Sequence, residues 1–218
     1  MEAIRAMSLM YEPLSLNAVV GLPRRGKTAF AILLALQAWL RGARIYSNVW
    51  IHDEDGNDLR DPEGRLDSED PGECLSQLSD IFLDIKEKET WFIDRFLVLD
   101  EFSSIADSQR WKEFSWTSDI WKQLGKLGFT GVAIDQNFSR IYNGYRDLVT
   151  YKYIVGNTDV NGDRVSLPYC AVIVGQQSAN DHAMYSPISD FPVNLKPVFK
   201  FYNTHELMYF GKSKKKSR

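Results

Sequence analysis

The most specific chemical pattern in this chain lies at residues 21–28. These residues match G-x-x-x-x-G-K-[ST], the Walker A motif, at every fixed position. In this motif the glycines let successive backbone N–H groups surround a β-phosphate, and the positive N-terminal end of the following helix faces the same anion. The lysine neutralises β- and γ-phosphate oxygens, and the hydroxyl holds Mg²⁺. We therefore predict that ATP and Mg²⁺ are bound by Gly21, Leu22, Pro23, Arg24, Arg25, Gly26, Lys27 and Thr28.

A pair of carboxylates follows a continuous apolar run further along the chain. Residues 96–99 lead directly into Asp100 and Glu101, so both acids stand where a buried strand is expected to end. Without other motifs, such a pair is usually only a strand end. Downstream of a Walker A motif it is typical of a Walker B element, in which Asp100 binds Mg²⁺ together with Thr28 and Glu101 polarises the attacking water. Most kinases and small GTPases keep their water-orienting group elsewhere, so the pair favours an ATPase.

Polar residues also follow the next apolar run, at residues 130–134. Gln136 would lie beside the Walker strands and sense the γ-phosphate, although Asp-Gln-Asn also suits a simple turn. Arg140, Arg146 and Lys152 come within the next sixteen residues. In a ring, one of these cations could reach the γ-phosphate of the neighbouring subunit as an arginine finger, and we select Arg146 for this role. The alternative for each is an ordinary surface cation.

These candidate residues need a scaffold that brings the ends of several strands together. The predicted helices are 28–41, 75–87, 111–127 and 141–148; the first is rich in helix formers and apolar nearly all round, and the second has apolar residues at helical spacing. Strands that alternate with helices and are apolar throughout indicate a mostly parallel α/β sheet covered on both faces. Such sheets bind ligands at the carboxyl ends of their strands, where all three polar clusters stand. The predicted strands are 16–20, 44–51, 96–99, 130–134, 151–155 and 170–174, with 198–202 as a last edge strand.

Composition and charge indicate one globular domain with an uneven charge distribution. The 218 residues are 44% hydrophobic and 25% charged, which excludes a disordered or repeat-built chain. No apolar run reaches the ~18 residues of a membrane span. We interpret residues 1–218 as a single domain with an acidic insertion at about 52–73, most simply a solvated loop, and a basic C-terminal tail at 212–218. Two widely separated cysteines point to a reducing compartment, hence the cytoplasm.

The order of the motifs resembles a known superfamily. Within residues 15–155 the chain resembles the FtsK/HerA superfamily of DNA-pumping ATPases. Four segments carry this resemblance by their order: GLPRRGKT, RIYSNV, FLVLDEF and GVAIDQNFSRIYNGYRDLV. One fitting branch is the zonula-occludens-toxin-like (Zot) assembly ATPases of filamentous phages, whose Asn, Gln and I-R-D-L-V run correspond to Asn48, Gln136 and residues 145–149. The other is the small genome-packaging ATPases of tailless, membrane-containing viruses, which are about this long. Zot-like proteins usually carry a membrane segment after the ATPase part; this sequence shows none, which favours the packaging branch.

The resemblance implies a three-layer RecA-like P-loop NTPase fold, ATP and Mg²⁺ as ligands, and a homo-oligomeric ring, expected to be a hexamer. Its client would be double-stranded DNA, or the capsid or membrane-associated proteins of a virion. We therefore expect an ATP-hydrolysing DNA translocase of the viral genome-packaging kind, in the host cytoplasm or on the virion. The alternative is a Zot-like morphogenesis ATPase that acts on coat proteins. A kinase is a weaker third interpretation, because the acidic insertion would repel a phosphorylated substrate.

Overall fold

The computed structural model describes residues 1–5, 7–67, 69–106, 112, 117–158, 169–177 and 185–202. Their centre is an eight-stranded sheet in the order β3-β2-β4-β5-β1-β6-β7-β8. Neighbouring strands are parallel from β3 to β6, whereas β7 is antiparallel to both β6 and β8. The strands are β1 (Leu16–Val20), β2 (Arg44–Ser47), β3 (Arg60–Arg65), β4 (Arg95–Leu99), β5 (Phe129–Asp135), β6 (Tyr151–Gly156), β7 (Tyr169–Gln177) and β8 (Tyr185–Asn194).

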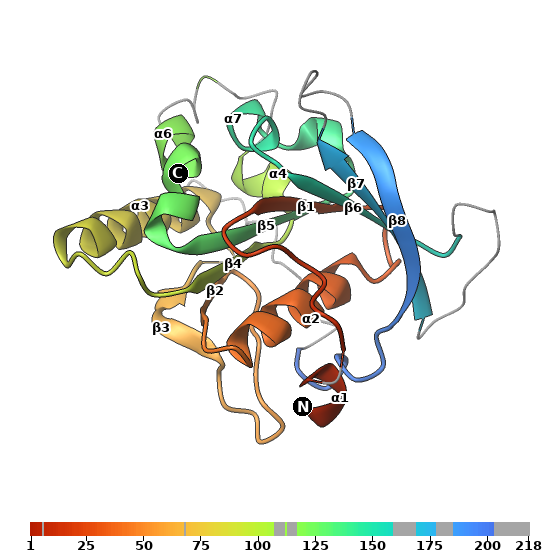
Figure 1. The fold of residues 1–218 in the computed structure, drawn as a ribbon. Helices are drawn as coiled ribbons and strands as arrows, with labels where there is room; N and C mark the ends of the chain where they lie inside the picture. The colour runs from red at the N-terminus through yellow and green to blue at the C-terminus, as the bar shows by residue number, and fades with distance from the viewer. Residues whose placement is uncertain are drawn as a thin grey trace, which may run out of the picture.

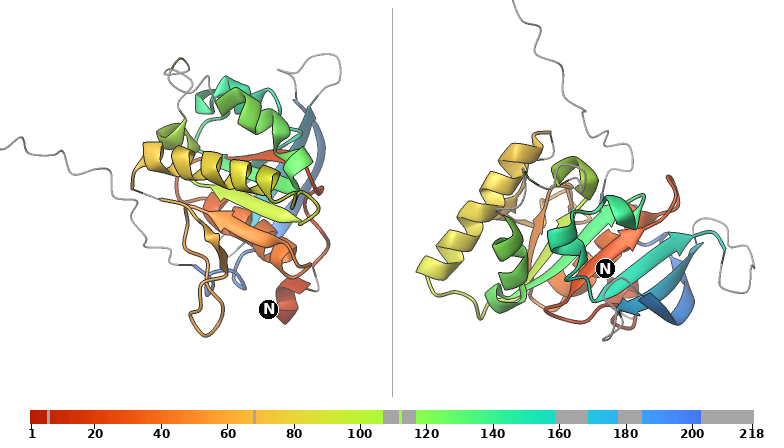
Figure 2. Two further views of the ribbon diagram at one scale, coloured as in Figure 1. Left: turned by 90° about the vertical axis from the view of Figure 1, so that its left-hand side faces the viewer. Right: turned by 90° about the horizontal axis from the view of Figure 1, so that it is seen from above.

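Helices cover both faces of this sheet (Figures 1 and 2). On one face α2 packs against the strands, with α1 beyond it; the remaining helices pack on the other face. Every residue of β1, β4 and β5 is buried, because these strands have helices on both sides. The predicted three-layer α/β fold is confirmed. The helices are α1 (Glu2–Arg5), α2 (Lys27–Trp39), α3 (Pro71–Glu87), α4 (Phe102–Ile105), α6 (Ser118–Gln123) and α7 (Asn143–Arg146), with 3-10 turns η3 (Gly125–Leu127) and η4 (Phe138–Arg140).

Most predicted elements are present with shifted bounds. The strand expected at 44–51 ends at Ser47. The helix expected at 75–87 begins earlier, because the Asp70 carboxylate accepts hydrogen bonds from two backbone N–H groups and caps α3. Of the helix expected at 111–127, the described part forms α6 and η3, while residue 111 and residues 113–116 lie outside the described residues.

The acidic insertion is only in part a loop, because it contributes β3. This strand lies parallel to β2 at the edge of the sheet. Its polar sequence, with Pro62 and Gly64, carries no hydrophobic periodicity that could predict a strand. A proline is tolerated at a sheet edge, where no ladder donor is missing. Gly64 is needed for close packing: a Cβ there would lie 2.7 Å from the carbonyl oxygen of Ile45.

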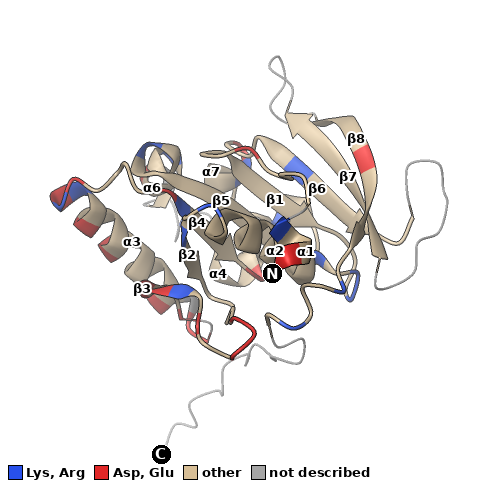
Figure 3. Cartoon of the chain, turned by 60° about the horizontal axis from the view of Figure 1, so that its bottom comes forward, with Lys and Arg blue, Asp and Glu red and all other residues tan. Residues whose placement is uncertain are grey.

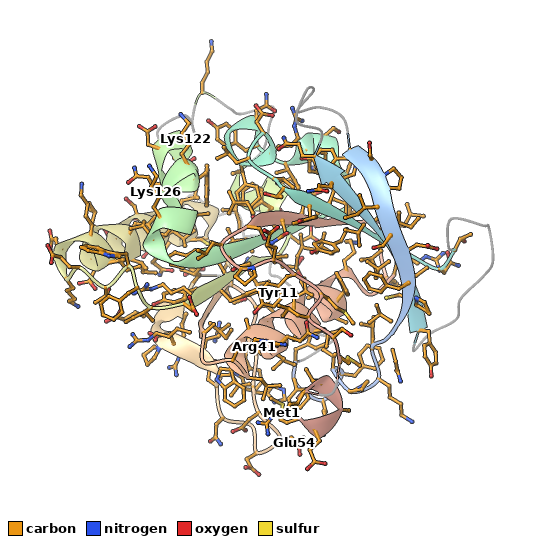
Figure 4. All side chains as sticks on the ribbon, viewed as in Figure 1. Met1, Tyr11, Arg41, Glu54, Lys122 and Lys126 are labelled. Carbon is orange, nitrogen blue, oxygen red and sulfur yellow. The ribbon has the colours of Figure 1, made fainter. Side chains whose placement is uncertain are left out.

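The charges of the insertion are paired in several places. The Asp58 carboxylate lies 2.9 Å from the guanidinium of Arg60 and 3.1 Å from that of Arg65. Glu54 bonds to both the amino group of Met1, at 3.0 Å, and the ammonium of Lys200, at 2.5 Å; Figure 4 shows Met1 beside Glu54. Acidic residues remain grouped around β3 and its preceding loop in Figure 3. The insertion is therefore anchored to the body of the domain and keeps a negative surface.

The predicted edge strand at 198–202 is wrong. The sheet ends instead with β8, and Tyr202 forms only an isolated bridge with Ile51. Pro187 and Pro192 lie within β8, and prolines in a sequence usually mark a strand's interruption. At an edge they cost no ladder hydrogen bond, because the outer side of the strand has no partner strand. Among the described residues, no helix is long and apolar enough to span a membrane.

Candidate nucleotide site

The Walker A loop leaves the carboxyl end of β1 and requires glycine at two positions. Gly26 has a φ angle of +88°, and a Cβ there would lie 2.6 Å from the Leu195 Cδ1 atom. Gly21 has a φ of +151° and lies against the backbone carbonyl of Val155 so closely that a Cβ would overlap it. Both the backbone conformation and the close packing therefore exclude other residue types. The fixed glycines of the motif build the turn itself.

Lys27 and the start of α2 add positive charge at the end of the loop, beyond that of Arg24 and Arg25. Residues 27–30, the first turn of this helix, include no acid, so nothing offsets the positive helix end. The Lys27 ammonium donates to the carbonyl oxygen of Leu22 at 3.1 Å and thus spans the loop. Burial lowers the pKa of Lys27, and the carboxylates of Asp100 and Glu101 act in the opposite direction. This arrangement suits a phosphate-sized anion.

Thr28 and Asp100 meet at the edge of the sheet. The Thr28 Oγ1 atom donates to Asp100 Oδ2 at 2.8 Å, although the two residues are 72 apart in sequence. Burial raises the pKa of Asp100, whereas the hydrogen bond from Thr28 lowers it. A hydroxyl and a carboxylate oxygen are ligands that Mg²⁺ accepts together with phosphate oxygens and water. Both predicted metal ligands therefore fit the ion. The described residues contain no cluster of three or more His, Cys, Asp or Glu suited to a metal.

Glu101 follows Asp100 in a left-handed backbone conformation, with φ 50° and ψ 48°. This conformation is uncommon for a residue with a side chain. Its backbone N–H donates to Asp100 Oδ1 at 2.8 Å, and α4 begins at the next residue. Burial, followed by the negative charges of Asp100 and Asp135, raises the pKa of Glu101. The sharp turn presents a half-buried carboxylate beside the predicted metal ligands.

Gln136 reaches the same edge because β5 lies between β1 and β4. In this register Val20 pairs with Asp135, and Leu99 with Ala133, so all three strands end together. Gln136 is exposed, as a residue that contacts a ligand from solvent must be. The preceding Asp135 is only 2% exposed, and its carboxylate accepts the backbone N–H of Gln136 at 2.7 Å. The predicted position of this strand beside the Walker strands is confirmed.

The three candidate cations differ in their surroundings. The Lys152 ammonium lies 5.1 Å from the Phe138 ring centre and 4.7 Å from that of Tyr185, so it is held over aromatic rings of its own chain. Arg146 donates to the carbonyl oxygen of Ser139 at 3.1 Å and is partly exposed. Arg140 is exposed, and its charge lowers the pKa of Glu101 against the stronger effect of burial. Of the three, Lys152 is thus the least free to reach a neighbouring molecule.

Asn48 is a residue of the site to which sequence reasoning assigns no role. Its side-chain Nδ2 donates to the carbonyl oxygen of Asp100 at 3.0 Å, and its Oδ1 accepts the Asp100 N–H at 2.9 Å. Asn48 is 3% exposed and follows β2, the strand next to β4. The amide therefore continues the sheet ladder by one step and holds the Asp100 backbone. In the sequence, only the match of Asn48 to the Asn of Zot-like proteins indicated that this residue belongs to the site.

The fold and the site together define the class of this protein. It is an α/β protein with the three-layer fold of P-loop NTPases, and its glycine loop, Thr28, Asp100 and Glu101 lie at one end of the parallel strands. The solved genome-packaging NTPase B204 from Sulfolobus turreted icosahedral virus 2, in complex with ATP-gammaS, is similar with a TM-score of 0.51 and 8% identity. That match covers 81% of this chain and 97% of the other.

A family model places the chain more narrowly. The model for zonular occludens toxin (Zot) matches residues 15–206, so the chain belongs to the Zot family, which confirms the resemblance seen in the sequence. The crystal structure of the N-terminal domain of zonular occludens toxin from Neisseria meningitidis also aligns, with a TM-score of 0.48 and 14% identity, over 88% of this chain and 100% of the other. No curated protein matches the sequence.

Proposed function

We propose that this protein hydrolyses ATP at the edge formed by β1, β4 and β5. The observation that carries the proposal is the hydrogen bond from Thr28 to Asp100 beside the glycine loop. Glu101 is held at the next position. The loop of residues 21–28 would hold the phosphates through its backbone N–H groups and Lys27. Thr28 and Asp100 would hold Mg²⁺, which shields the charge of the phosphate oxygens.

The remaining residues have separate roles in this proposal. Glu101 orients and polarises the water that attacks the γ-phosphate, and its raised pKa suits a group that takes up a proton during the reaction. Gln136, exposed at the end of β5, contacts the γ-phosphate and senses its presence. Arg146 acts on the neighbouring subunit, exchanging its bond to the Ser139 carbonyl for a phosphate oxygen. Arg140 is the alternative, because its charge already acts on Glu101.

We further propose that hydrolysis moves double-stranded DNA through a ring of subunits, expected to be hexameric, in viral genome packaging. The fold shared with a genome-packaging NTPase supports this role. A second candidate, the remodelling of coat proteins during phage assembly, is favoured by membership of the Zot family and by the acidic surface around β3, which would repel a DNA backbone. The two candidates share the ATPase site and differ in the client.

DNA should stimulate ATP hydrolysis if the protein is a translocase. We expect the rate per subunit to rise when duplex DNA of any sequence is added at low salt, and the rise to fall steeply at higher salt, because bound phosphates displace counterions. The measurement is steady-state hydrolysis with and without duplex at two salt concentrations. If the assembled protein hydrolyses ATP but DNA neither binds nor changes the rate, DNA translocation is excluded and coat-protein remodelling takes its place.

Replacement of Asn48 should weaken magnesium binding selectively. In Asn48→Ala the Asp100 N–H and carbonyl lose their side-chain partners, so the backbone that carries the carboxylate is less firmly fixed and only the Thr28 bond still orients it. Loss of a group that orients a metal ligand typically weakens metal affinity ~10- to 100-fold. We expect the Mg²⁺ concentration for half-maximal hydrolysis to rise by about tenfold, measured by magnesium titration at saturating ATP.

Asn17→Ala is the matched control for this experiment. Asn17 is also a buried asparagine, and its amide bonds to the Gly131 carbonyl at 3.1 Å, near the amino end of β1 and away from the carboxyl ends of the strands. This variant should lose comparable thermal stability without a change in the magnesium requirement. Equal magnesium curves for the two variants would contradict the role of Asn48.

A further inference from the structure

The Asp135 carboxylate joins the two sides of the proposed site. Its Oδ1 atom accepts the backbone N–H of Gln136 at 2.7 Å and that of Asn137 at 3.2 Å. Its Oδ2 atom accepts the backbone N–H of Ser103 at 2.8 Å, 32 residues away in sequence. Ser103 lies two residues after Glu101, at the start of α4. One buried carboxylate therefore contacts the backbone next to both proposed functional side chains.

The bond to Ser103 matters because the Glu101 backbone is in a conformation that it would not adopt freely. A left-handed conformation is disfavoured for a residue with a side chain, so surrounding contacts must maintain it. From one side, Asn48 holds the backbone of Asp100 through two hydrogen bonds. From the other side, Asp135 holds the backbone of Ser103. Glu101 lies between these two anchors, and the Asp135 anchor also fixes the residue proposed to contact the γ-phosphate.

We propose that Asp135 is a positioning residue that holds Gln136 and Glu101 in a fixed spatial relation, so that a displacement of Gln136 by the γ-phosphate moves Glu101. This inference rests on the proposed ATPase function. Asp135 is 2% exposed and both of its oxygens are occupied by backbone N–H groups, so it acts through its neighbours and not on the substrate. The contacts run through backbone atoms of β5 and α4, which neighbour each other in the fold.

The test is a pair of double-mutant cycles. In Asp135→Asn the side chain keeps its shape, but its NH₂ group must face one of the N–H donors, so at least one side of the link is lost. We expect turnover to fall ~10-fold or more with KM for ATP unchanged within about twofold, because the phosphate loop is intact. Residues that act as a unit give non-additive losses. The loss from Asp135→Asn should therefore shrink in the Glu101→Gln background and in the Gln136→Ala background; the second cycle carries the test of the link, because the charge of Asp135 also acts directly on Glu101.

Single-turnover hydrolysis, binding of a fluorescent ATP analogue and thermal unfolding are measured for each variant. Asp70→Asn is the matched control: its carboxylate also accepts two backbone N–H groups at a helix start, those of Gly72 and Glu73, but away from the site. Because Oδ1 accepts both bonds and an amide oxygen can take its place, this variant should keep wild-type turnover and lose little thermal stability. A purely structural role for Asp135 would lower stability without the non-additive loss of turnover.

Each outcome decides the inference. Losses that multiply in either cycle, or wild-type turnover in folded Asp135→Asn, overturn it. If Asp135→Asn does not fold, Asp135→Ser replaces it, since a serine hydroxyl can still accept a local N–H but is too short to reach Ser103. If neither variant folds, Asp135 is a stability residue and the inference is wrong. A wild-type protein without ATPase activity overturns the proposed function itself. If the wild type is active, Glu101→Gln is inactive and the turnover losses of the double mutants multiply, only the proposed role of Asp135 is overturned.

Discussion

Lys27→Ala should abolish nucleotide binding or hydrolysis. The ammonium spans the glycine loop by its bond to the Leu22 carbonyl, and in the Walker A motif this lysine is the charge that neutralises β- and γ-phosphate oxygens. In a partly buried site its loss is not compensated by solvent, and removal of a comparable charge-stabilising contact costs at least ~10²-fold in rate. Binding of a fluorescent ATP analogue and steady-state hydrolysis report the two effects separately.

Lys122→Ala is the control for this substitution. Lys122 is exposed on α6 and pairs only loosely with Asp119, at 3.5 Å, so its removal should change neither measurement. Figure 4 shows Lys122 on α6, well away from α2. Retention of full activity in folded Lys27→Ala would show that the loop of residues 21–28 does not bind the reacting phosphates.

Glu101→Gln should still bind ATP but lose turnover by ~10²-fold or more, because an amide cannot take up the proton of the attacking water. The amide has the same shape as the carboxylate, so the turn between Asp100 and α4 should persist. Bound nucleotide would then accumulate without hydrolysis. Comparison of the dissociation constant for ATP with the single-turnover rate separates binding from chemistry.

Glu87→Gln provides the matched control on the exposed surface of α3. It makes the same change of charge and should leave both quantities at their wild-type values. Wild-type turnover in Glu101→Gln would refute the role of Glu101 as the water-activating group, while the proposed roles of Thr28, Lys27 and Asp100 in binding would be unaffected.

The parts of the site that the sequence predicted are those encoded by neighbouring residues. A glycine spacing dictates a local turn, and a continuous apolar run dictates a buried strand whose next residue lies at an edge of the sheet. Local patterns were therefore enough to locate the Walker A loop and the strand ends at Asp100 and Gln136. The same logic failed for β3 and β8, which lie at the edges: edge strands need no apolar pattern and tolerate proline, so their sequences resemble loops.

Tertiary structure alone decided which residues support the site. The bonds of Asn48 to Asp100 and of Asp135 to Ser103 depend on the strand order, which places β4 between β2 and β5. The same order brings Lys152 of β6 to Phe138 and Tyr185, whose rings hold its ammonium. Strand order follows from the packing of the whole sheet against α2 and the helices opposite. A hydrogen bond between residues 32 or 52 positions apart has no local pattern in the sequence, because neither partner influences the conformation of the chain near the other until the sheet has formed.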